Sequence, residues 1–263
     1  MLEEIKSLPP LPVSVIRIQE ICMNNDTDIE ELSRVIEHDP MLSANILKSV
    51  NSPLYGMSKE ISSIHQAVML FGISMIRGFA AASAIKKSVS VDLSSYCATI
   101  DELTQISALQ TALAREWYRS DDKTMLPLLQ SCAFLMELGK LVASHKVIRS
   151  GNLDRFLKEI EDGEPLDAVE KKYLDSSSYD IAAAMFEHWN FEPALIDALK
   201  EISDPSPQNV YAQVLKVITQ AVNFQGIFSE EGISAALESI EHFGLNKSKF
   251  EEAVLTVKEA QKG

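Results

Sequence analysis

The amino-acid sequence predicts an all-α protein, a helical bundle, and three observations carry this prediction. Apolar residues recur three and four positions apart in most segments, for example over residues 28–38. Prolines, capping residues and glycines fall where these segments begin and end. No stretch shows the strict alternation of apolar and polar residues that is typical of a half-buried strand.

In the first part of the chain, helices are predicted over residues 28–38, 40–50, 64–71 and 73–88. Thr27 is expected to begin a capping box for the first of them. Asp39 and Pro40 fit the N-cap and the first-turn proline of the second. Ser63 can cap the third, which Gly72 would end. The fourth is rich in small residues and suited to close packing.

In the rest of the chain, further helices are predicted near residues 101–120, 126–147, 154–162, 166–174, 179–190, 193–202, 210–221, 230–243 and 246–261. The Asp-Pro-Ser-Pro stretch at 204–207 is the clearest break, and a weaker linker spans residues 88–95. We therefore expect an N-terminal helical subdomain over 1–95, a second over 96–205, and a C-terminal helical extension over 206–263.

Composition excludes several classes of protein. Against 24 basic residues stand 38 acidic ones, and the formal charge of −14 disfavours binding to nucleic acid. No run of 18 apolar residues occurs, so no membrane span is predicted, and the N-terminus lacks the pattern of a signal peptide. The three cysteines lie far apart, which favours the reducing cytoplasm over a disulfide framework.

Four segments resemble, in order and spacing, the hallmark segments of HDOD domains. They are residues 8–12 (LPPLP), 35–42 (VIEHDPML), 51–56 (NSPLYG) and 64–72 (IHQAVMLFG). The resemblance covers about residues 5–205. It implies an N-terminal helical subdomain specific to the family, packed on a domain similar to the HD phosphohydrolases. It also implies a role in bacterial signal transduction.

The resemblance implies where the metal ligands of a hydrolytic HD site would fall, and this chain carries other residues there. The His-Asp pair is replaced by Met136 and Glu137, just before Gly139 and Lys140, and a thioether is a poor ligand for the hard cations that activate water. The remaining ligand positions align with Ser107, Ser178, and Ile202 with Ser203. We therefore expect no catalytic residues, no metal and no cofactor. Glu137 is expected in a salt bridge or hydrogen bond, and Gly139 with Lys140 in helix packing.

The other reactive side chains give no alternative chemistry. No two of the five histidines lie three or four positions apart, so we expect each on the surface or in packing contacts. Cys132 lies in an apolar helix and is expected to be an inert, buried thiol. The motifs of serine hydrolases, P-loops, dinucleotide folds and EF-hands are absent.

A recognition surface is the remaining candidate site. Loops on a rigid helical scaffold often carry function, although helix capping explains the same residues more simply. The candidate residues are Asp39, Pro40, Asn51, Ser52, Tyr55 and Gly56.

Three functions stay open at this point. The chain could be a non-catalytic regulatory module that acts through a protein partner, which we expect. It could bind a small nucleotide such as cyclic di-GMP in the former active site, with Lys140 and Arg115 as phosphate contacts. A residual metal-dependent phosphohydrolase is the least expected of the three.

Overall fold

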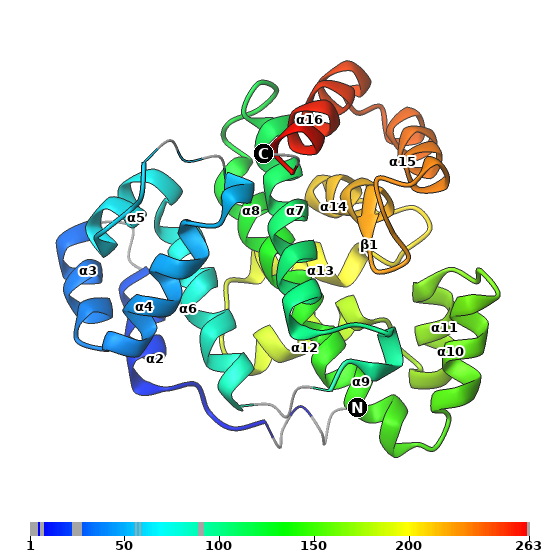
Figure 1. The fold of residues 1–263 in the computed structure, drawn as a ribbon, viewed down its shortest axis with the longest axis horizontal. Coiled ribbons are helices and arrows are strands. Elements are labelled where there is room, and N and C mark those ends of the chain that lie inside the picture. The colour runs from blue at the N-terminus through cyan, green and yellow to red at the C-terminus, as the bar shows by residue number, and fades with distance from the viewer. Residues whose placement is uncertain are drawn as a thin grey trace.

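The computed structural model describes residue 5 and residues 8–22, 28–55, 57, 59–88 and 92–261. It confirms the all-α fold class (Figure 1). The N-terminal elements are α2 (Val13–Cys22), α3 (Ile29–Glu37), α4 (Pro40–Val50), the 3-10 turn η1 (Pro53–Tyr55), α5 (Ile64–Phe71) and α6 (Ile73–Ser88). The central elements are η2 (Ser94–Tyr96), α7 (Ile100–Tyr118), α8 (Leu126–Leu135), η3 (Met136–Leu138), α9 (Gly139–Arg149), α10 (Leu153–Glu161), α11 (Leu166–Leu174), α12 (Ser178–His188) and α13 (Pro193–Glu201). The C-terminal elements are α14 (Val210–Ala221), β1 (Val222–Asn223), β2 (Gly226–Ile227), α15 (Glu230–Phe243) and α16 (Lys247–Ala260).

The N-terminal helices form a group on one side of the molecule, to the left in Figure 1. Helix α6 contacts α2, α4 and α5, and it also contacts α8. The alanines of α6, including Ala80, Ala81 and Ala84, are buried. Small side chains let helix axes approach closely, so α6 can join this group to the centre of the fold.

Two of the predicted caps are confirmed and one is wrong. Asp39 accepts a hydrogen bond from the amide of Leu42 at 3.0 Å, and Ser63 accepts one from the amide of Gln66 at 3.2 Å. Thr27 lies outside the described residues, and it is Asp28 that caps α3, one residue later than predicted. Both residue types cap helices well, so the sequence does not decide between such neighbours.

The centre of the fold is built on α7 and α8, which pack along each other. The predicted continuous helix over residues 126–147 is wrong, because the 3-10 turn η3 separates α8 from α9. Residues 132–136, which lead into the turn, are all apolar, so the sequence holds no phase change there that would reveal the break. Helix α9 then packs against α12.

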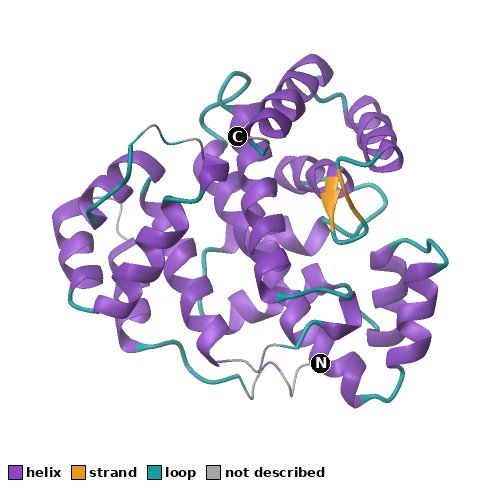
Figure 2. Cartoon of the chain, in the orientation of Figure 1, coloured by secondary structure: helices purple, strands orange, loops and turns teal. Residues whose placement is uncertain are grey.

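The C-terminal helices pack on the central ones. Helix α14 contacts α7, α8, α13 and α15, and α16 lies on α7. The ring of Trp117 is 5.0 Å from that of Phe250, and its indole N–H donates to the carbonyl of Asn246 at 3.1 Å. The hairpin formed by β1 and β2 (orange in Figure 2) was not predicted, since two residues per strand are too few to show alternation.

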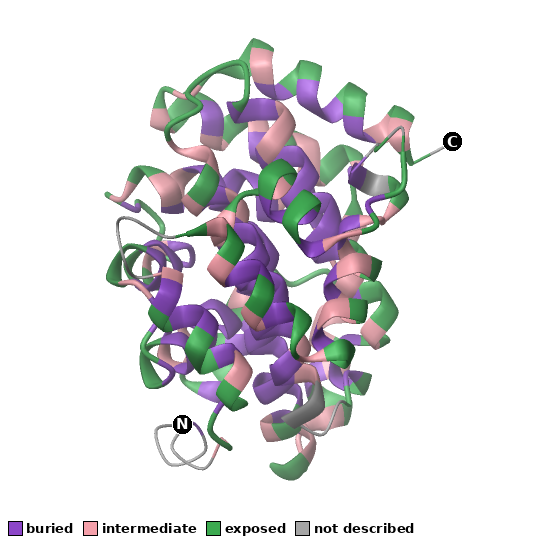
Figure 3. Ribbon diagram, turned by 90° about the vertical axis from the view of Figure 1, so that its left-hand side faces the viewer, coloured by how far each residue is buried: buried purple, intermediate pink, exposed green. Residues whose placement is uncertain are grey.

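One continuous cluster of buried apolar side chains runs through the molecule, and it includes members from all three predicted subdomains. Figure 3 shows buried residues along the inner faces of the helices and exposed ones outside. Because the core is shared, the boundaries near residues 95 and 205 stay predictions.

Leu126–Arg149 is long and apolar enough to cross a membrane by length and composition, with a mean hydropathy of 1.3. The bent pair formed by α5 and α6 also passes this test when taken as one broken span. However, 78% of the apolar window in Leu126–Arg149 is buried inside the fold, which is typical of a core helix. This stretch is therefore weak evidence for a span.

Candidate functional site

An ion pair lies at the position where the HD resemblance places the metal ligands. Glu137 in η3 and Lys140 in the first turn of α9 are 0% and 1% exposed, and Nζ of Lys140 is 2.7 Å from Oε2 of Glu137. Gln110 of α7 donates through Nε2 to Oε1 of Glu137 at 2.7 Å and to the carbonyl of Val222 at 2.9 Å. The expected salt bridge of Glu137 is therefore confirmed.

Three aromatic rings surround the ammonium group of Lys140. Its Nζ lies 4.6 Å from the ring centroid of Tyr179, 5.7 Å from that of Phe224 and 5.8 Å from that of Tyr96. It also donates to Oγ of Ser178 at 3.0 Å. Cation–π contacts are strongest where water is excluded, so this cage favours a charged lysine in the interior.

A second buried carboxyl group, that of Glu170 in α11, borders the same cluster. It accepts hydrogen bonds from the hydroxyl of Tyr96 at 2.9 Å and from the amide of Ser178 at 2.6 Å. Glu170, Tyr96 and Gln110 were not predicted as site residues, because they come from three separate elements that meet only in the folded chain. The spacing of Glu137 and Lys140, three apart, was the one local signal.

Burial and charge act against each other in this cluster. Burial opposes the charge of Lys140, but Glu137, Tyr179 and Glu170 outweigh it and raise the pKa of Lys140 above its ordinary value. Burial raises the pKa of Glu170, although Lys140 and the bonds from Ser178 and Tyr96 act in the other direction. Lys140 therefore holds its proton at neutral pH, and Glu170 holds its proton to a higher pH than an exposed glutamate would.

We expect the free energy of unfolding to depend on pH through Glu170. The folded state keeps the proton of Glu170 above pH 4.5, the ordinary value, while the unfolded chain releases it. Stability therefore falls as pH rises from 4.5 through the raised pKa. Glu170→Gln keeps the acceptor for Ser178 and removes the titration, so its stability should fall less over this range. Urea denaturation at several pH values measures both slopes, with Glu230→Gln as the exposed control. Equal slopes in wild type and Glu170→Gln would contradict the assignment.

A cavity of about 570 Å³ opens beside the ion pair. Lys140, Glu170, Tyr179 and Ser203 line one side, and α14, the hairpin and the first turn of α15 line the other. This volume is in the range of small-molecule sites in proteins.

The residues aligned with metal ligands are buried and only partly brought together. Glu137 and Ser178 share contacts with Lys140, and Ser203 reaches the cavity. Met136 is buried, and the buried Oγ of Ser107 has no hydrogen-bond partner within the described residues.

These side chains do not fit a metal ion. The set offers one thioether, three hydroxyl groups and one carboxylate, and that carboxylate already faces an ammonium group at 2.7 Å. Across the described part of the chain, no three His, Cys, Asp or Glu side chains form a group that could hold a metal. The five histidines are all exposed, as expected. Cys132 is buried, which raises the pKa of its thiol to about 12, so its expected inertness agrees with its setting.

Most of the predicted recognition residues have structural roles. Asp39 caps α4 and accepts a bond from Ser14, and Pro40 is the first residue of α4. Asn51 bonds the backbone of Leu47 once and that of Ile61 twice. Tyr55 is 2% exposed, Ser52 is half-buried, and Gly56 lies outside the described residues. A recognition role at this loop stays a prediction.

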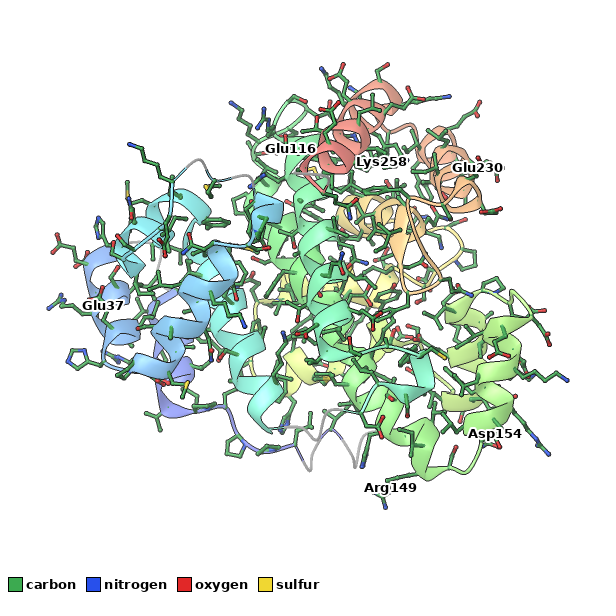
Figure 4. All side chains as sticks on the ribbon, viewed as in Figure 1. Glu37, Glu116, Arg149, Asp154, Glu230 and Lys258 are labelled. Carbon is green, nitrogen blue, oxygen red and sulfur yellow. The ribbon has the colours of Figure 1, made fainter. Side chains whose placement is uncertain are left out.

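A second hollow, of about 470 Å³, lies beside that loop. Its lining includes Tyr55, Met57, Leu70, Arg115 and Arg119. Arg115 is therefore not beside Lys140, and its predicted role as a phosphate contact in the former active site is wrong. Arg115 and Arg119 both pair with Glu116, at 3.1 and 3.3 Å, and Figure 4 shows Glu116 near α16.

The fold and the site define an HD-like helical domain whose ligand positions carry Ser, Met and Glu. The family model of the HDOD domain matches residues 8–205, and the chain belongs to the HDOD family.

Solved structures show the same fold. A candidate phosphohydrolase of Shewanella amazonensis superposes with a TM-score of 0.69 at 20% identity, covering 98% of this chain and 93% of that one. A candidate signal transduction protein of Marinobacter aquaeolei gives 0.70 at 24%, covering 99% and 59%. An HDOD domain protein of Geobacter sulfurreducens, of unknown function, gives 0.60 at 17%, covering 98% and 97%.

A curated relative, an uncharacterized protein of Treponema pallidum (strain Nichols), is 23% identical over 209 residues. The match covers 75% of this chain and 38% of that protein, so the chain spans well under half of the relative's length. At these identities the similarities establish the fold alone.

Proposed function

We propose that this chain is a non-catalytic regulatory module of bacterial, cytoplasmic signal transduction and that it acts by binding a partner protein. The observation that carries this proposal is the set of side chains at the former ligand positions: one thioether, three hydroxyl groups and a single carboxylate, Glu137, which is already paired with Lys140. Membership of the HDOD family supports it, as does the Marinobacter neighbour described as a candidate signal transduction protein.

An ammonium group cannot replace the chemistry of the cation. A catalytic metal lowers the pKa of a bound water and polarises a phosphoryl oxygen through open coordination positions. Lys140 instead directs its donors at Glu137 and Ser178, inside a cage of three aromatic rings. Lys140 therefore contributes charge balance and packing, and neither role generates a nucleophile.

The second hollow supports binding to a protein. Leu70 and Met57 are 58% and 37% exposed there, and Arg119 adds a basic rim to an otherwise acidic molecule. An amphipathic helix with an acidic edge fits such a surface, because its apolar side chains would cover Leu70 and its carboxylates would face Arg119.

We expect the purified chain to show no metal-dependent hydrolysis of phosphomonoesters or phosphodiesters. Activity is measured with p-nitrophenyl phosphate and bis-p-nitrophenyl phosphate, each with Mn²⁺, Mg²⁺ or Fe²⁺. Glu137→Gln is the matched variant, because it removes the only carboxylate in the former ligand set while keeping its shape. An activity that Glu137→Gln loses while it stays folded, judged by circular dichroism, would contradict the proposal.

Partner binding is tested by affinity capture with the full chain, followed by titration of the isolated partner. Leu70→Asp should weaken binding at least tenfold, because a carboxylate would face the apolar side of the partner. Val13→Asp is the control, since Val13 is 83% exposed on α2 and does not line the hollow. If both substitutions changed the affinity equally, the partner would bind to a surface other than the hollow beside Leu70.

Binding of a nucleotide second messenger such as cyclic di-GMP remains the second candidate, and the cavity beside Lys140 is what favours it. Its lining weakens that case, because Glu137 balances the charge of Lys140, and the carboxylates of Asp167 and Glu231 then outnumber the ammonium group of Lys216. A residual phosphohydrolase is the third candidate, and the assay with Glu137→Gln decides it.

A further inference from the structure

The cavity of about 570 Å³ lies where the HDOD match meets the C-terminal segment. Residues up to Ser203 belong to the match, and Lys216 to Ala235 come after it. A molecule bound here would contact both parts of the chain. In Figure 1 the hairpin at β1 lies between α14 and the pair formed by α10 and α11.

Two polar side chains in this lining lack hydrogen-bond partners. Ser203 is 6% exposed, and its buried Oγ has no partner within the described residues. The buried amide oxygen of Gln220 has none there either. An unsatisfied buried polar group costs free energy, so a ligand that supplies the missing bonds gains affinity from these positions.

The charges at the cavity select the sign of the ligand. Asp167 lies in the first turn of α11 and Glu231 in the first turn of α15, and neither forms an ion pair with a described residue. Glu137 balances the charge of Lys140, whereas Lys216 donates only to the uncharged carbonyl of Asp204 and keeps its charge, which Asp167 feels. Two carboxylates, Asp167 and Glu231, therefore stand against one uncompensated ammonium group, and the net charge at the cavity is negative.

We propose that this cavity binds a small cationic amine or guanidine. The carboxylates of Asp167 and Glu231 hold the cation, and Ser203 with Gln220 accepts its hydrogen bonds. Because these side chains come from both parts of the chain, the bound molecule ties α11 to α15. This site is separate from the hollow beside Leu70, so it goes beyond partner binding.

The test is calorimetric titration of the full chain with agmatine, a small molecule that carries an amine and a guanidinium group. Salt at about 0.15 M screens diffuse attraction to the acidic surface. We expect saturable binding of one agmatine per chain. Asp167→Asn and Glu231→Gln should each weaken it at least tenfold, and Ser203→Ala about threefold. Hydrogen exchange of the α15 amides should slow on binding.

Glu230→Gln is the matched control, because Glu230 (labelled in Figure 4) lies in the same first turn as Glu231, is exposed and does not line the cavity. It should bind agmatine like wild type. The proposal is overturned if wild type shows no saturable binding, or if Glu230→Gln weakens binding as much as Glu231→Gln. Tighter binding of cyclic di-GMP than of agmatine, lost in Lys216→Ala, would assign the cavity to an anion instead. Binding without slower exchange in α15 would overturn the link between the two parts.

Discussion

Replacing Gly139 with alanine is expected to destabilise the protein by about 3 kcal/mol or more, or to prevent folding. An added Cβ would overlap the carbonyl oxygen of Ser178 and would lie 2.8 Å from the amide nitrogen of Ala182. Both atoms belong to the backbone of α12, so no side chain can move aside. Urea denaturation followed by circular dichroism measures the change.

Gly78→Ala is the matched control for this substitution. Gly78 lies within α6, and its added Cβ would meet Leu135 and Phe134 at 3.8 Å, an ordinary contact distance. Alanine also favours helix over glycine, so this variant should gain up to about 1 kcal/mol. Equal stability of Gly139→Ala and wild type would show that α9 and α12 are farther apart than described.

Replacing Lys140 with methionine is expected to cost about 3 to 5 kcal/mol, because it leaves the buried carboxylate of Glu137 without its counterion. The loss should be greater at neutral than at acidic pH, since the raised pKa of Glu170 lets that neighbouring carboxylate take up a proton as the pH falls. In the wild type, the raised pKa of Lys140 means that its stabilising contribution is complete below pH 10.5, the ordinary value, and is lost as the pH rises through the raised pKa.

The double variant Lys140→Met with Glu137→Gln separates charge from packing. It removes both members of the ion pair, and replacing a buried pair outright is often close to neutral. We expect it to recover at least half of the stability that Lys140→Met loses, as measured by denaturation at pH 7. A double variant as unstable as the single one would show that the cage of rings around Lys140, and not its charge, carries the effect.

The fold could be predicted largely because its local signals are strong. The cap at Asp39 and the glycine at the end of α5 mark helix boundaries that the structure confirms. The 3-10 turn at η3 could not be predicted, because an apolar helix buried on all sides has no polar face whose phase would shift. The hairpin after α14 was missed for the opposite reason, its extreme shortness.

The site could be predicted only as far as neighbours along the chain define it. Glu137 and Lys140 lie three residues apart, so their pairing follows from helical geometry. No local pattern indicates that Glu170 and Gln110 join them. Glu170 contacts Ser178, 8 residues away, and Gln110 contacts Glu137, 27 residues away, and both contacts depend on how the helices pack. The error at Arg115 has the same origin, because its helix face was assigned without knowing which neighbour covers it.

The HDOD match ends at residue 205, yet α14 supplies Val214, Val217 and Ile218 to the shared core, all with no exposed surface. Phe224, in the hairpin, completes the cage around Lys140. The unit that can be exchanged between proteins by recombination is therefore longer than the unit that sequence similarity delimits. A chimaera joined at residue 205 would lack α14 and would expose the apolar side chains of α7 and α8 that α14 covers. A chimaera joined after α16 would keep these side chains buried.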